Sequence, residues 1–186
     1  MNGFYGLKNS FSGDSPKMAL TSKLQKIRMI LSDVDGCLTD GSLVFDEQGN
    51  EIKAFHARDG LGITIWKRKG GLIGFVTRRC TSVVKKRAEE LKIQELCQGV
   101  ENKVALLANI CAKYGLSSDE VAYVGDDLVD FDIMKAVGVS ACPADSVPEI
   151  IEIADYVCQT NGGKGVVREL IEQILKARGE WNNFGF

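Results

Sequence analysis

The sequence lacks the features that mark several large classes of protein. Its formal net charge is only -2 over 186 residues, with no basic block or stripe, so nucleic-acid binding has no electrostatic footprint. No apolar run approaches the length of a membrane span, and the N-terminal stretch has no charged-then-apolar secretory signal. Internal repeats and low-complexity segments are missing as well. We therefore expect a cytoplasmic globular protein that binds neither nucleic acid nor membranes.

Paired cysteines are also missing, although the chain has six cysteines. No two of them are close enough for a CxxC motif, which argues against the common zinc and dithiol sites. Single cysteines in apolar surroundings are typical of small buried side chains in a reducing compartment. We expect this structural role for all six: Cys37, Cys80, Cys97, Cys111, Cys142 and Cys158.

The composition is otherwise that of an ordinary globular domain. Hydrophobic residues make up 45% and charged residues 26% of the chain, and the length is enough for one domain with a sizeable core. Residues 1–22 are rich in Gly, Ser, Asn and Lys without a clear period, which predicts a flexible N-terminal arm. We assign a single domain to residues 23–180 and a C-terminal tail to residues 181–186.

Short apolar runs alternate with amphipathic stretches from residue 26 onward. This alternation predicts an α/β fold with a doubly wound, mainly parallel sheet and helices on both faces. A β-hairpin with a glycine turn is expected at about residues 41–56. Expected strands lie at 27–31, 72–76, 121–124, 139–142 and 155–157. Expected helices lie at 60–69, 82–91, 103–114, 131–137, from 147, and at 165–178.

Polar side chains follow three of the expected strands. Asp33 and Asp35 follow the first strand, Thr77 follows the second, and Asp126 and Asp127 follow the third. Ligands of such sheets bind outside the carboxyl ends of the strands. We therefore expect these side chains to form one site.

The two carboxylates after the first strand fit phosphoryl transfer. Asp33 is the candidate nucleophile, which would attack phosphorus and form an aspartyl-phosphate. Asp35 could protonate the leaving oxygen as a general acid and then activate water as a base. A Mg²⁺ ion could be held by Asp33, Asp126 and the backbone carbonyl of Asp35.

Three further groups complete this interpretation. Thr77 offers a hydroxyl donor and Lys103 a full positive charge to the phosphoryl oxygens. Asp127 is placed to orient Lys103 or a metal-bound water. Each residue alone also has an ordinary role, since an Asp after a strand often forms a turn or caps a helix. The order of all the groups along the chain is what favours a phosphatase.

The ordered set DVDGCLTDG, Thr77 after LIGFV, Lys103 and VGDDLVD resembles the four motifs of the haloacid dehalogenase superfamily of phosphatases. The resemblance covers residues 27 to about 177. It implies a Rossmann-like sheet of the haloacid dehalogenase type, a Mg²⁺ cofactor and an aspartyl-phosphate intermediate. It also implies the roles given above for Asp33, Asp35 and Asp126.

The hairpin, the segment KAFHARDGLGI and the late segment NGGKGVVREL resemble a narrower group in that superfamily. Its members release the eight-carbon sugar acid used in lipopolysaccharide from its 8-phosphate. The resemblance implies a small hairpin flap in place of a cap domain, and a homotetramer in which neighbouring subunits cover each site. Residues 162–165 resemble a tail segment that reaches a site, although a loop before a helix is an equal alternative. The implied substrate contacts are Asp35, His56, Ala57, Arg58, Asp59, Gly60, Thr64, Arg79, Arg87 and Lys103.

The residues themselves suggest how a sugar acid phosphate would be recognised. Its carboxylate needs a cation apart from the phosphate site, and Arg58, Arg79 and Arg87 are candidates because guanidinium pairs bidentately with carboxylate. His56 is the only histidine, and we interpret it as a substrate contact. The usual Thr-Gly-Arg of the second motif is here Thr77-Arg78-Arg79. Arg78 either crowds the site or turns outward.

Three other interpretations remain open. The substrate could be a nine-carbon, sialic-acid-like sugar acid 9-phosphate on the same scaffold. A signalling receiver domain also uses an Asp, a Thr and a Lys, but its acidic pair comes early and it has no counterpart of Asp35. A phosphatase-like domain that only binds or assembles is favoured by Arg78 alone.

Overall fold

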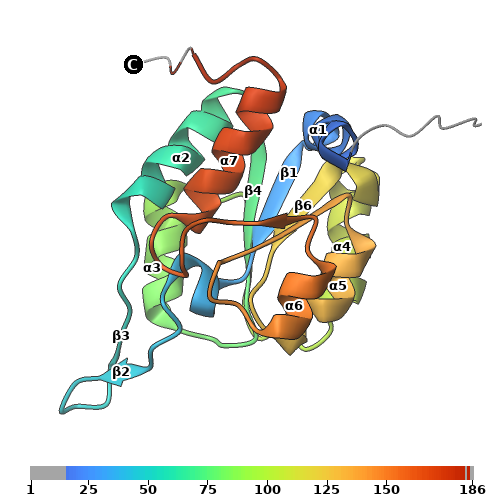
Figure 1. Ribbon diagram of the computed structural model, residues 1–186. Coiled ribbons are helices and arrows are strands. Elements are labelled where there is room, and N and C mark those ends of the chain that lie inside the picture. The colour runs from blue at the N-terminus through green and yellow to red at the C-terminus, as the bar shows by residue number, and fades with distance from the viewer. Residues whose placement is uncertain (1–15, 183, 185–186) are drawn as a thin grey trace, which may run out of the picture.

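A six-stranded sheet forms the centre of the computed structural model, which describes residues 16–182 and 184 (Figure 1). The strands are β1 (Met29–Ser32), β4 (Leu72–Val76), β5 (Glu95–Cys97), β6 (Val121–Val124), β7 (Val139–Cys142) and β8 (Tyr156–Val157). Their order is β5-β4-β1-β6-β7-β8, and every neighbouring pair is parallel. Along the chain, the central strand β1 is followed by β4 and β5 on one side of it, and then by β6, β7 and β8 on the other side. This is the predicted doubly wound arrangement.

Helices cover both faces of the sheet. Because successive strand residues point to opposite faces, Ile30 packs in one core while Met29 and Leu31 pack in the other, all fully buried. The first core lies under α1 (Pro16–Lys26), α2 (Ala57–Arg68), α3 (Ser82–Leu91) and α7 (Val166–Ala177). The second lies under α4 (Lys103–Tyr114), α5 (Phe131–Ala136) and α6 (Pro148–Ile153). No helix in the described part of the chain is both long and apolar enough to cross a membrane.

A small antiparallel hairpin projects from the body near the carboxyl end of β1 (Figure 1). It consists of β2 (Val44–Phe45) and β3 (Glu51–Ile52). Its turn is held by Asp46, whose Oδ1 accepts hydrogen bonds from the backbone N–H groups of Gln48 and Asn50. The hairpin predicted within residues 41–56 is confirmed, and we call this segment the flap.

The structure differs from the predictions at the N-terminus and at one sheet edge. Residues 16–22, predicted as part of a flexible arm, lie in α1, because Leu24 is buried and Leu20 packs against the first core. The rest of the predicted arm, residues 1–15, lies outside the described residues. Strand β5 was not predicted, since its three residues are only half-buried and show no alternation. In the predicted tail, Trp181 packs against the first core, whereas residues 183, 185 and 186 are not described.

Candidate active site

The carboxyl ends of the three central strands bring the predicted catalytic groups together. Ser32 is in register with Phe75 of β4 and with Val124 of β6, so the residues that follow the three strands emerge side by side. The backbone N–H of Asp33 donates to the carbonyl of Val124 at 2.9 Å. Thr77 follows β4 directly, and Asp126 follows β6 after one glycine. The expected meeting of Asp33, Thr77 and Asp126 at this edge is what parallel pairing produces.

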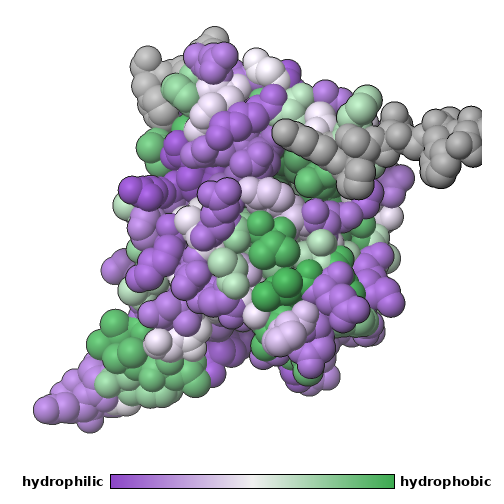
Figure 2. All heavy atoms as spheres, in the orientation of Figure 1, coloured by the Kyte–Doolittle hydropathy of each residue, from purple (hydrophilic) through white to green (hydrophobic). Residues whose placement is uncertain are grey.

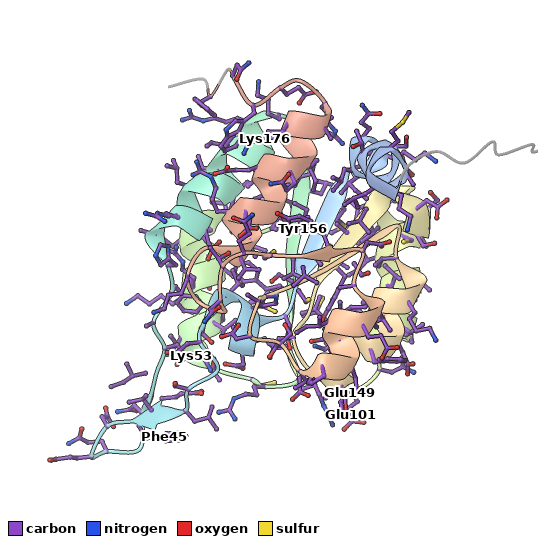
Figure 3. All side chains as sticks on the ribbon, in the orientation of Figure 1. Phe45, Lys53, Glu101, Glu149, Tyr156 and Lys176 are labelled. Atoms are coloured by element: carbon purple, nitrogen blue, oxygen red, sulfur yellow. The ribbon has the colours of Figure 1, made fainter. Side chains whose placement is uncertain are left out.

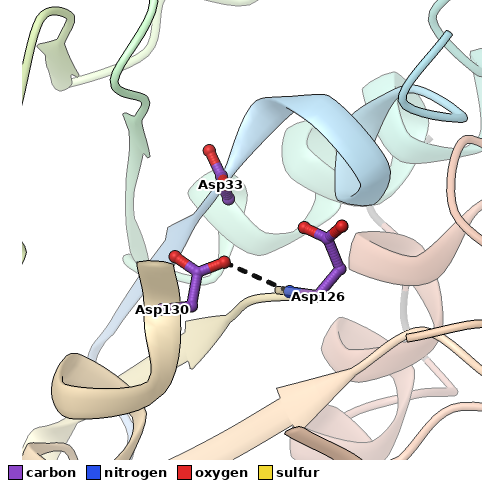
Figure 4. A group of neighbouring side chains, drawn as sticks. All are labelled: Asp33, Asp126 and Asp130. Atoms are coloured by element: carbon purple, nitrogen blue, oxygen red, sulfur yellow. Dashed lines mark hydrogen bonds between the residues drawn. The ribbon is translucent and has the colours of Figure 1, made fainter. Parts of the chain in front are cut away.

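Three carboxylates converge at this edge (Figure 4). One oxygen each of Asp33, Asp126 and Asp130 lies within 4.8 Å of the others. Asp130 uses both oxygens internally: Oδ1 accepts from Lys103 and Tyr123, each at 2.6 Å, and Oδ2 accepts from the backbone N–H of Asp126 at 3.2 Å. Carboxylate oxygens are the ligands that Mg²⁺ prefers in proteins. The donor set therefore fits a magnesium ion held by Asp33 and Asp126, with Asp130 as their support.

Lys103 is buried between two of these carboxylates. Its Nζ lies 3.2 Å from Oδ2 of Asp33 and 2.6 Å from Oδ1 of Asp130, and it also donates to the Tyr123 hydroxyl at 3.0 Å. Burial lowers the pKa of Lys103, but the carboxylates of Asp33 and Asp130 raise it by more. The ammonium therefore keeps its charge beside the candidate nucleophile.

The carboxylate that contacts Lys103 is Asp130 rather than Asp127. Of the two roles predicted for Asp127, orienting Lys103 was therefore wrong, and orienting a metal-bound water stays a prediction. Asp127 is exposed, and its Oδ1 accepts from the backbone N–H of Leu128 at 2.7 Å, which caps a short turn. No role was predicted for Asp130 from the sequence, although it is the last residue of the segment VGDDLVD. Its position four residues after Asp126, a spacing that puts two side chains on one face wherever the chain is helical, was the available signal.

The two candidate metal ligands have strongly shifted acidities. Burial raises the pKa of Asp33 to about 8, and the neighbouring Asp130 adds to this rise while Lys103 opposes it. Burial also raises the pKa of Asp126 to about 7, again with Asp130 contributing. The single positive charge of Lys103 only partly offsets the negative charge of these neighbouring buried carboxylates. A bound divalent cation would offset the remaining negative charge.

We expect Mg²⁺ binding to strengthen by at least about tenfold between pH 6 and pH 8, because the cation must displace protons held by Asp33 and Asp126. Both folded pKa values lie above the unfolded value of 3.8, so the metal-free fold gains stability from this protonation at low pH. That gain is lost progressively as the pH rises from 3.8, where the unfolded chain releases these protons, to about 8, where the folded chain has released them as well. Titration calorimetry in buffers of different ionisation enthalpy measures both affinity and proton release. Binding that is independent of pH, with no proton release, contradicts the prediction.

A cavity of about 260 Å³ opens beside this cluster. Thr77 is buried at its wall, where its Oγ1 accepts from the backbone N–H of Arg79 at 3.1 Å. The side chain of Arg78 is exposed at the rim, so of the two alternatives for this residue the structure favours the outward one. The cavity is lined by Asp35, Gly36, Gly41, Thr77, Arg78, Arg79, Asp126, Asp127 and Val129.

Asp35 is held by residues of the flap. Its Oδ1 pairs with Nζ of Lys53, and its Oδ2 lies 3.9 Å from Nε of Arg79. Glu51 accepts from both cations, at 2.9 Å from Lys53 and 2.8 Å from Arg79. No role for Glu51 or Lys53 was predicted from the sequence. Their spacing of two residues, which puts both on one face of a strand, was a signal for such a pair.

The segment that precedes α7 packs on the loop that carries Asp35. The backbone N–H of Gly163 donates to the carbonyl of Cys37 at 2.9 Å. A Cβ atom on Gly162 would lie 2.0 Å from the carbonyl oxygen of Gly36, so only glycine allows this approach. Within one chain, Gly162 and Gly163 therefore pack on the catalytic loop, which is more than the plain connection we considered.

The predicted substrate contacts at the start of α2 have structural partners within the chain. His56 caps this helix, and its Nδ1 accepts from the backbone N–H of Arg58 at 3.2 Å. Ala57 is the first residue of the helix. Asp59 is buried, and its Oδ1 accepts from the backbone N–H of Arg168 at 2.8 Å. Arg58 lines a separate cavity of about 410 Å³ beside α7.

The remaining predicted contacts also lie outside the cavity of Asp35 and Thr77. Arg87 pairs with Glu90 at 2.8 Å, and a Cβ atom on Gly60 would lie 2.7 Å from its guanidinium. Thr64 lines a third cavity, of about 390 Å³, between α2 and α3. Of the predicted substrate contacts, Asp35 and Arg79 line the cavity of Thr77 and Asp126. Lys103 contacts Asp33 and lines a further cavity of about 270 Å³.

The chain is similar to known hydrolases over most of its length. Residues 76–170 match the family of haloacid dehalogenase-like hydrolases. The 3-deoxy-D-manno-octulosonate 8-phosphate phosphatase of Escherichia coli strain K12 is 39% identical over 159 residues, covering 86% of this chain and 85% of that protein. The phosphatase of that name from Yersinia pestis has a crystal structure with a TM-score of 0.86 and 35% identity, covering 88% of this chain and 89% of that one.

The phosphatase of the same name from Moraxella catarrhalis was crystallised in complex with a magnesium ion, a phosphate ion and 3-deoxy-D-manno-octulosonate (KDO). Its structure matches this one with a TM-score of 0.86 and 34% identity, covering 89% of this chain and 95% of that chain.

Proposed function

Because the chain belongs to the haloacid dehalogenase-like hydrolases, and matches their KDO 8-phosphate phosphatases over most of its length, we propose that it hydrolyses KDO 8-phosphate to KDO and phosphate. It is a phosphoric monoester hydrolase that uses Mg²⁺. The observation that carries the proposal is the carboxylate cluster of Asp33, Asp126 and Asp130, with Lys103 between two of its members. The product would serve lipopolysaccharide biosynthesis.

The proposed reaction has two displacements at phosphorus. In the first, a carboxylate oxygen of Asp33 bonds to phosphorus, the bond from phosphorus to the sugar oxygen breaks, and Asp35 gives that oxygen its proton. In the second, Asp35 takes a proton from the water that attacks phosphorus. Phosphate leaves, and the carboxylate of Asp33 is restored.

The other groups stabilise charge on the phosphoryl oxygens. Lys103 supplies a buried positive charge close to Asp33, and Thr77 supplies a hydroxyl at the cavity wall. Both groups are buried, and fixed charges and dipoles are most effective where water is excluded. Mg²⁺, when bound by Asp33, Asp126 and the Asp35 carbonyl, neutralises the repulsion between the attacking carboxylate and the phosphate. Of the predicted carboxylate contacts, Arg79 is the one that lines this cavity and would receive the substrate carboxylate.

We also propose that the chain acts as a homotetramer in which the flap contacts a second copy. The support is a group of exposed apolar side chains on the flap, visible in Figure 2. They are Leu43, Val44, Phe45 and Ile52. Contact between copies would bury this surface and could bring the substrate contacts that lie outside the cavity, such as Arg58, to a neighbouring site. Light scattering of the purified protein tests this, and a fully active monomer contradicts it.

A cytoplasmic location forms part of the same proposal. All six cysteines are free, and three of them are buried. Free cysteines that persist in the folded protein are typical of a reducing compartment. The proposed partner is a small sugar acid phosphate, with no nucleic acid or membrane involved.

A panel of phosphorylated sugar acids tests the proposed function. We expect kcat/KM to be highest for KDO 8-phosphate, to be lost without Mg²⁺, and to exceed the value for a nine-carbon sugar acid 9-phosphate. The reverse order would assign the nine-carbon substrate instead. A long-lived aspartyl-phosphate would indicate a receiver-type domain, and no turnover of any phosphate would indicate a domain that only binds.

A further inference from the structure

The flap reaches the catalytic loop through one buried ammonium group. The side chain of Lys53 is 1% exposed, and its Nζ contacts Oδ1 of Asp35 and, at 2.9 Å, Oε1 of Glu51. Figure 3 shows Lys53 where the flap joins the body, whereas Phe45 lies on the projecting part. Four large apolar side chains of the flap are exposed, so Lys53 is a buried polar anchor on an otherwise exposed segment.

Stability alone does not explain this arrangement. Removing an ammonium and a carboxylate from water costs free energy, and well-packed apolar side chains often replace a buried ion pair without loss of stability. What a buried pair does provide is fixed geometry. The side chain of Asp35 is 20% exposed at the cavity wall, and without a partner its carboxyl group would sample several rotamers.

The two carboxylate oxygens of Asp35 have different partners. Lys53 contacts Oδ1. Nε of Arg79 lies 3.9 Å from Oδ2, beyond hydrogen-bond distance, and makes no hydrogen bond among the described residues. Oδ2 can therefore carry the proton that is exchanged with the leaving oxygen and with water. Glu51 balances the charge, because it pairs with Lys53 and Arg79 together.

We propose that Lys53 is a positioning residue of the hydrolysis: it holds the carboxyl group of Asp35 toward the leaving oxygen, so proton transfer requires a seated flap. This inference rests on the proposed function, in which Asp35 is the acid and base. In this role Lys53 acts through its contact with Oδ1 of Asp35. It acts on the rate of the proton-transfer steps and leaves substrate affinity and magnesium affinity unchanged.

The test compares Lys53→Met with wild type using KDO 8-phosphate as substrate. General acid and base catalysis contributes about 10²–10⁴ to a rate, so we expect kcat to fall about a hundredfold while KM changes less than about threefold. Lys53→Arg, which keeps the charge, should recover most of this loss. Lys113→Met is the matched control, because Lys113 also pairs with a glutamate, Glu95, but is exposed and outside the cavity. An unchanged kcat, or a rise in KM alone, overturns the proposal.

A double-mutant cycle separates positioning from a general structural effect. In an Asp35→Asn background, measured with enzyme in excess so that slow rates remain visible, adding Lys53→Met should change the rate less than about twofold. An equal hundredfold loss in both backgrounds means that Lys53 does not act through Asp35. If Lys53→Met fails to fold, the same measurements are made with Lys53→Gln in both backgrounds. If the wild-type protein has no phosphatase activity, the proposed function itself is wrong. If the wild type and Lys53→Met are equally active, the proposed function stands and only the inference about Lys53 is wrong.

Discussion

An Asp33→Asn variant is expected to release no phosphate above background, a loss of about 10⁴-fold or more in kcat. The amide has the shape of the carboxylate but is neither a competent nucleophile nor an anionic metal ligand. Asp33 lies at the carboxyl end of β1, with Oδ1 accepting from the backbone N–H of Val34 at 2.7 Å and Oδ2 facing Lys103 at 3.2 Å. Phosphate release under saturating substrate and Mg²⁺ is the measurement.

The same variant should not lose stability in the absence of metal. Burial raises the pKa of Asp33 to about 8, so the neutral amide avoids a desolvation cost that the carboxylate bears at alkaline pH. We expect the melting temperature of the metal-free variant at pH 8.5 to equal or exceed that of wild type. Asp119→Asn, at an exposed carboxylate away from the site, controls for loss of charge alone. Turnover by Asp33→Asn at the wild-type rate would remove Asp33 as the nucleophile.

A Gly36→Ala variant is the second change with a large expected effect. Gly36 has φ +84°, and a Cβ atom there would lie 2.0 Å from Oδ2 of Asp126. The left-handed conformation costs an alanine about 1–2 kcal/mol, and the contact forces the carboxylate of a candidate metal ligand to move. Displacement of about 1 Å can cost about 10²-fold in rate. We therefore expect weaker Mg²⁺ binding and at least that loss in kcat.

Gly70→Ala is the matched control for this prediction. Gly70 has a nearly identical φ of +80°, and a Cβ atom there meets nothing within 4 Å. It should show a comparable backbone cost with full activity and normal Mg²⁺ affinity. Calorimetric Mg²⁺ titration and kcat, measured on both variants, separate the two causes. Equal behaviour of the two variants would mean that the conformation of glycine, and not its closeness to Asp126, is what the loop requires.

Features that depend on local sequence patterns were predicted correctly, whereas features that depend on packing between distant segments were missed. The sheet, its helical layers and the flap followed from apolar periodicity, which is local information. Asp33, Thr77 and Asp126 came together because parallel strands with aligned register end at one edge. The helix over residues 16–22 was missed because its helicity depends on burying Leu20 and Leu24 against a core assembled from distant segments.

The sequence by itself determined the fold class, the family and the order of the phosphoryl-transfer groups, because these depend on periodicity and on motifs at strand ends. Only the tertiary structure decided that Asp130 orients Lys103, and that Lys53 and Glu51 reach Asp35 from the flap. It also separated Arg58 and Thr64 from the cavity lined by Arg79. Contacts between side chains from distant segments depend on how elements pack and which rotamers that packing allows, and spacing along the chain does not specify either.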